Sequence, residues 1–234
     1  RLLDQTTQYD VPDRPGRCCA PTTAVAATLM HGPEAFERLV RNLRRDLILG
    51  RTPANPEAKG GMTRTDAEES LSEVLRRIEN RSLTREDVGR VTDLLARFGQ
   101  ATMDRGSGMN ESVRMMHLGS AGERQASEQP ANGPDFRRWI HEELRPGEVV
   151  RTSIDADGDA QGLAVNNHAI LVGKDARGRE YLYDPLPKAE DRGQVVYLHE
   201  DPEQYAYYLD RMLRYDPNSK GEVAPIFGGK IFSY

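Results

Sequence analysis

The stretch Cys19–Met30 has the sequence CAPTTAVAATLM, and it is the most informative segment of the chain. Its proline, Pro21, suits the first turn of a helix, where the missing N–H leaves no intrahelical hydrogen bond unmade. The alanine-rich run behind it favours helix formation and is almost fully apolar, so we predict a buried helix that ends at Gly32-Pro33. Cys19 then lies at or just before the N-terminus of a buried helix.

A cysteine in this position is a candidate nucleophile. The unpaired N–H groups and the partial positive charge of a helix N-terminus favour the thiolate, which is the reactive form. The two cysteines of the chain, Cys18 and Cys19, are adjacent, and a disulfide between neighbours is strained, so at least one thiol is expected to be free. The alternative interpretation is that Cys19 is a small buried hydrophobe, as free cysteines often are.

The pattern of apolar residues changes from helical spacing to strand spacing along the chain. Further helices are predicted near residues 36–47, 71–78, 84–98 and 136–144, the third of them capped by Thr84 and Asp87. Residues 100–134 are rich in Gly, Ser, Asn and Gln, and we expect at most one short helix there, near 109–118. Strands are predicted at residues 148–154, 167–173, 180–184 and 194–198, followed by a helix with packed tyrosines at 205–212 and an edge strand at 231–234. Helices followed by mostly antiparallel strands predict an α+β fold.

His168 and Asp184 flank a predicted hairpin turn at residues 174–179. A turn centred near Ala176 would place His168 directly opposite Asp184 on one face of the sheet. Opposed Cβ atoms lie about 4.5–5.5 Å apart, which allows a hydrogen bond between imidazole and carboxylate. Such a bond supports the charged form of the histidine, as a nucleophile–His–acid triad requires. Pro185 is expected to end the pairing directly after Asp184.

Two glutamines precede Cys19 and are candidates for oxyanion stabilisation. The side-chain amide of Gln5 or Gln8 could join the backbone N–H of Cys19 as a donor, and the residues alone do not choose between them.

Other patterns give no metal or cofactor site. The run Asp155–Asp159 resembles the start of a calcium loop, but Ala160 and Asn166 stand where that loop needs glycine and glutamate, so we interpret it as a polar turn. The cysteines lack the second Cys/His pair of a zinc site. We therefore predict no cofactor and no metal, and we expect the remaining histidines to face solvent: His31, His117, His141 and His199.

The composition excludes several classes of partner. With 32 basic and 37 acidic residues the net charge is -5, which gives no general attraction to nucleic acid or anionic lipid. No apolar run reaches the length of about 18 residues that a transmembrane helix needs. Oligomeric state leaves no signal in the sequence.

The segments Gln8-Tyr9-Asp10, Cys19-Ala20-Pro21-Thr22, His168–Gly173 and Tyr181–Pro185 together resemble papain-like cysteine peptidases of the bacteriocin-processing (double-glycine peptidase-like) type. The resemblance implies a papain-like fold, with an N-terminal catalytic helix packed on a mostly antiparallel sheet. It implies one domain over residues 1–234, with a helical insertion at about 50–134. It also implies Cys19 as nucleophile, His168 as general base and acid, Asp184 as the residue that orients His168, and Gln8 in the oxyanion hole. The chain departs from the family at Ala20, where glycine is usual, at Val11, where asparagine is common, and in the additional Cys18.

This resemblance implies a cysteine peptidase that cleaves a protein or peptide substrate through a thioester acyl-enzyme. Two alternatives remain open: a deamidase or transglutaminase acting on Gln side chains of a target protein, and a catalytically silent binding module on the same fold. By analogy the protein is expected to be a secreted or translocated bacterial effector. No targeting segment is visible after Arg1, so we expect any such segment to lie upstream.

Overall fold

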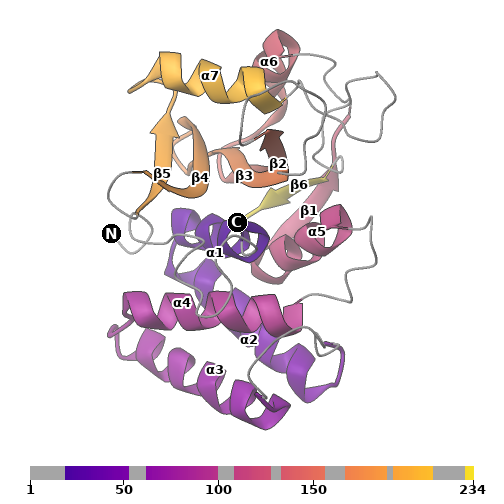
Figure 1. Ribbon diagram of the computed structural model, residues 1–234, viewed down its shortest axis with the longest axis vertical. Coiled ribbons are helices and arrows are strands. Elements are labelled where there is room, and N and C mark those ends of the chain that lie inside the picture. The colour runs from indigo at the N-terminus through magenta and orange to yellow at the C-terminus, as the bar shows by residue number, and fades with distance from the viewer. Residues whose placement is uncertain are drawn as a thin grey trace.

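The structure is a computed structural model that describes residues 19–52, 62–99, 108–127, 133–155, 167–188, 192–212 and 230–234. The described part has an α+β fold in which most helices precede the sheet along the chain, as the sequence predicts (Figure 1). Its α-helices are α1 (Cys19–His31), α2 (Pro33–Ile48), α3 (Arg64–Glu79), α4 (Arg85–Leu94), α5 (Gly108–Gly119), α6 (Gly133–Glu143) and α7 (Pro202–Met212). A π-helical turn, Leu95–Gly99, extends α4. Among these helices, none offers the apolar length that a bilayer crossing requires.

The described strands form one antiparallel sheet in the order β1-β6-β2-β3-β4-β5. They are β1 (Gly122–Gln125), β2 (Glu148–Asp155), β3 (Asn167–Lys174), β4 (Glu180–Lys188), β5 (Arg192–Tyr197) and β6 (Lys230–Ser233). Strands β2 to β5 correspond to predicted strands, although β4 continues past Pro185 to an irregular pairing with β5. The prediction of an edge strand at the C-terminus is wrong, because β6 lies between β1 and β2.

The sheet separates two apolar cores, because successive side chains of a strand point to opposite faces. Leu171 of β3 and Tyr183 of β4 belong to the core that is shared with α1 to α5. Their neighbours Val172 and Leu182 belong to the core that is shared with α6 and α7. Figure 1 shows this division, with α6 and α7 on one side of the sheet and α1 to α4 on the other.

Helix α1 is the central helix of the larger core. Its residues 24–27 have no exposed surface, as the apolar run predicts. Gly119 of α5 approaches α1 so closely that a Cβ at this position would collide with Cγ2 of Thr28. The helix ends at His31 and is followed by Gly32, whose φ of 114° favours glycine.

The segment predicted as a helical insertion, at about 50–134, supplies α3, α4, α5 and β1 among the described residues. Both α3 and α4 begin with capping boxes, Thr63 with Asp66 and the predicted Thr84 with Asp87. Helix α5 corresponds to the predicted short helix near 109–118. Buried side chains of these helices belong to the same core as α1, and β1 joins the sheet, so the described part of the segment is integral to the fold.

Candidate functional site

The first element of the candidate site is the start of α1. Cys19 is the first residue of this helix, as predicted, and Pro21 lies in its first turn. Thr22 is fully buried, and its hydroxyl has no hydrogen-bond partner among the described residues. The first turn thus combines the positive end of the helix dipole with an unpaired hydroxyl. The structure describes the backbone of Cys19 but not the placement of its side chain. Gln5, Gln8 and Cys18 lie outside the described residues.

The opposite end of α1 is attached to the sheet through its last residue. The Nε2 atom of His31 lies 3.1 Å from the hydroxyl oxygen of Tyr181, and Tyr181 of β4 pairs with Gly173 of β3. The middle of α1 packs in the same core as Leu171, two residues before Gly173. The last residue of α1 therefore lies beside the end of β3 that leads into the hairpin turn.

The length of α1 and the length of β3 up to Gly173 are similar. Helix α1 has 13 residues and rises about 18 Å from Cys19 to His31. The part of β3 between His168 and Gly173 spans about 17 Å. Ile170 and Val172, with which the position of His168 alternates along β3, belong to the core on the α7 side, so this strand position falls on the side of the sheet opposite α1.

The register of the β3–β4 hairpin differs from the predicted one. The pairs between the two strands are centred on Arg177 and not on Ala176. In the continuation of this register Asp184 falls opposite Ile170, so the prediction that it stands directly opposite His168 is wrong. The His168 backbone pairs with Ile154 of β2 on its other side, while its side chain lies outside the described part.

The turn explains the shift. The Oδ1 atom of Asp175 accepts hydrogen bonds of 2.9 Å from the backbone N–H groups of both Arg177 and Arg179. Gly178 then takes a φ of 78°, which a glycine tolerates. An aspartate that binds the backbone two and four residues onward moves the centre of the turn past Ala176.

Asp184 is buried and bound by α7. It is 5% exposed, and its Oδ2 accepts a hydrogen bond of 2.7 Å from the hydroxyl of Tyr208. Asp184 follows Leu182 by two positions and shares its sheet face, so its carboxylate lies on the α7 side, opposite α1. Tyr208, which we predicted as a packing residue, is therefore also a polar partner. In the sequence, Tyr208 is one of several tyrosines close together in the same helix. That pattern does not indicate a hydrogen bond to Asp184.

His31 corrects the expectation that the remaining histidines face solvent. Its ring stacks on Tyr234, with 5.2 Å between ring centroids. Burial lowers the pKa of His31 to about 4, and the nearby carboxylate of Asp175 offsets this only in part. The imidazole is therefore neutral near pH 7 and is a structural contact at the end of α1. The other three histidines, His117, His141 and His199, are exposed as expected.

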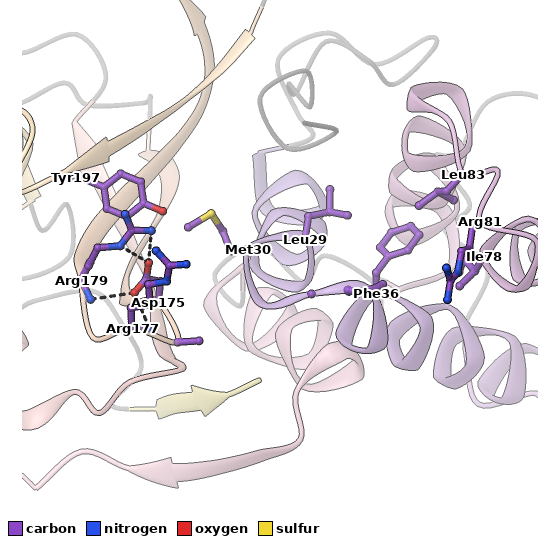
Figure 2. A pocket seen from close by; sticks show the side chains of 13 residues that line it. Leu29, Met30, Phe36, Ile78, Arg81, Leu83, Asp175, Arg177, Arg179 and Tyr197 are labelled. Carbon is purple, nitrogen blue, oxygen red and sulfur yellow. Dashed lines mark hydrogen bonds and ion pairs between the residues drawn. The ribbon is translucent and has the colours of Figure 1, made fainter.

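A second candidate site lies at the end of α1 remote from Cys19. A cavity of about 660 Å³ opens there, between α1, α2, the connection from α3 to α4, and the β3–β4 turn (Figure 2). Its lining comes from separate parts of the chain, so no local motif signals it and the sequence analysis did not find it. Within the described residues no group of three His, Cys, Asp or Glu side chains is placed to hold a metal ion.

Comparison of the chain with protein-family models, curated proteins and solved structures finds no match. The class of the protein therefore follows from its own architecture: an α+β protein in which a buried helix, beginning at a cysteine, packs on one face of an antiparallel sheet.

Proposed function

We propose that the chain is a thiol hydrolase of papain-like fold that acts as a cysteine peptidase, with Cys19 as nucleophile and His168 as general base and acid. The proposal is supported above all by Cys19 at the first position of the buried helix α1, which packs in the same core as Leu171 of β3. It requires the imidazole of His168, near the beginning of β3, to reach the start of α1 from its strand position on the α7 side. A buried N-terminal helix packed on an antiparallel sheet supports the papain-like fold.

In the proposed mechanism the start of α1 favours the Cys19 thiolate, and the His168 imidazole takes the thiol proton. The sulfur attacks the substrate carbonyl carbon, while the backbone N–H of Cys19 and the amide of Gln8 stabilise the charge that develops on oxygen. The C–N bond breaks as His168 returns the proton to the leaving amine, and a thioester remains. Water, deprotonated by His168, then releases the carboxylic acid product and regenerates the thiol.

Asp184 has a more distant role in this proposal than the sequence predicts. The continued register makes Asp184 a diagonal neighbour of His168, and diagonal positions in a sheet lie about 7–8 Å apart. With one carboxylate oxygen bound by Tyr208, we assign Asp184 as a fixed negative charge that supports the His168 imidazolium through space. This role predicts a smaller loss of activity on its removal than on removal of Cys19 or His168.

The proposal is tested with a proteome-derived peptide library, which covers many substrate sequences at once. Mass spectrometry of the products distinguishes the outcomes: new peptide termini indicate a peptidase, and conversion of Gln to Glu in intact peptides indicates a deamidase. Cys19→Ala and His168→Ala should abolish cleavage, while Cys18→Ala provides a matched control with a neighbouring thiol removed. Cleavage that persists in purified, folded Cys19→Ala, or a wild-type protein that changes no peptide, would contradict the proposal.

A further inference from the structure

The cavity at the far end of α1 has an apolar interior. Leu29 and Met30 from α1, Phe36 from α2, and Ile78 and Leu83 from the α3–α4 region line it. These side chains come from elements that pack together in the larger core, so the interior of the cavity is supported by the fold. Its volume of about 660 Å³ is in the range of small-molecule sites, which is roughly 300–1,000 Å³.

Two arginines border this apolar interior from opposite sides. Figure 2 shows Arg177 on the hairpin side and Arg81 on the helical side, with Leu29, Met30 and Phe36 between them. Arg81 and Arg177 are both exposed, and within the described residues neither guanidinium has a hydrogen-bond or ion-pair partner.

The other charges of the lining compensate each other. The Nη2 atom of Arg179 lies 2.7 Å from Oδ2 of Asp175, and its guanidinium also stands 4.6 Å from the ring centroid of Tyr197. Asp175 is the one carboxylate among the described lining residues, so Arg81 and Arg177 give this lining a net positive charge. This contrasts with the net charge of -5 of the whole chain.

The backbone of Arg81 provides a separate observation. Arg81 has a φ of 52°, in the left-handed region, directly after the C-terminus of α3. Glycine or asparagine is usual at this position because other residues are strained there. An arginine in a strained conformation at the border of a cavity suggests a function for its side chain.

We propose that this cavity is a binding site for a small amphipathic anion, a molecule with an apolar body and one terminal carboxylate. The apolar body would occupy the space among Leu29, Met30 and Phe36, and the carboxylate would be bound by Arg81 at one border of the cavity. Arg177, at the opposite border, would add to the positive potential that attracts the anion. The site lies about 18 Å along α1 from Cys19, so it is separate from the proposed catalytic end and does not depend on that proposal.

The test uses decanoate as the probe, with isothermal titration calorimetry on the full chain below the concentration at which decanoate forms micelles. Decanoate should bind, acetate should not because it lacks the apolar body, and decylammonium should not because its charge is opposite. Binding should weaken as salt is raised, since both arginines are exposed.

Substitution of Arg81 and Arg177 measures how much each guanidinium contributes to decanoate binding. Arg81→Gln should weaken decanoate binding about fivefold, Arg177→Gln about twofold, and the double variant more than either. Arg76→Gln is the matched control, because Arg76 is an exposed arginine of α3 outside the lining, and it should bind as the wild type does. Absence of decanoate binding, equal binding of decylammonium, or unchanged affinity in the folded double variant would each overturn the proposal.

Discussion

Acidification should destabilise this protein through His31. The imidazole is partly buried between Tyr181 and Tyr234, and this burial lowers its pKa from 6.5 to about 4 despite the opposing influence of Asp175. Between these two values the unfolded chain binds a proton that the folded protein does not. The contribution of His31 to stability is therefore complete above pH 6.5 and is lost as the pH falls toward 4.

The size of the effect follows from the same two values. The interval between 6.5 and about 4 is equivalent to roughly 3 kcal/mol at most. Most of the titration of the unfolded chain lies within pH 5–7, so the expected loss of unfolding free energy between pH 7 and pH 5 is about 1.5–2 kcal/mol.

Denaturant titrations at pH 5 and pH 7 measure this loss. Because carboxylates also contribute at low pH, the informative quantity is the difference between the wild type and His31→Gln, which lacks the titrating group. Between pH 7 and pH 5 the unfolding free energy of the wild type should therefore fall by about 1.5–2 kcal/mol more than that of His31→Gln. His199→Gln is the control, since it removes an exposed histidine and keeps His31. An identical pH dependence in His31→Gln and the wild type would refute this account of the α1–sheet contact.

Three further substitutions test other contacts, each by denaturant titration at pH 7. Tyr208→Phe removes the donor to buried Asp184 and should cost about 1–2 kcal/mol; an unchanged stability would mean that this hydrogen bond does not form. Gly173→Ala places a Cβ 2.8 Å from the Glu148 carbonyl oxygen and should cost about 2–3 kcal/mol, whereas tolerance of alanine would contradict the close packing of β2 on β3. Arg81→Gly relieves the left-handed backbone and should raise stability by about 0.5–1 kcal/mol while decanoate binding weakens; a loss of stability would show that Arg81 is not strained.

Features encoded by local sequence could be predicted. The apolar run 19–30 became the buried helix α1, and the spacing of Thr84 and Asp87 became a capping box, because each depends on residues within a few positions of one another. Strand β1 escaped prediction, since its sequence GERQ has no apolar alternation and its pairing with β6 depends on residues more than 100 positions away. Missing β1 also led to the error about the C-terminal edge strand.

The candidate site depended on contacts that sequence alone could not supply. The hairpin was predicted, but the side-chain hydrogen bonds of Asp175 moved its centre by one residue and so changed the partner of Asp184. The contact of Asp184 with Tyr208 joins a strand to a helix and needed the packing of α7 on the sheet. The cavity beside Arg81 and Arg177 is formed by several separate segments, and its arginines look like ordinary surface residues in the sequence.

The central claim is that the Cys19 thiol is activated by the start of α1 together with His168. The most direct test is the rate of alkylation of Cys19 by iodoacetamide as a function of pH, measured by peptide mass in a Cys18→Ala background so that a single thiol reacts. We predict a rate profile whose midpoint lies well below the ordinary thiol value of about 8.5, and which moves toward that value in His168→Ala. A midpoint near 8.5 in both proteins would contradict the account.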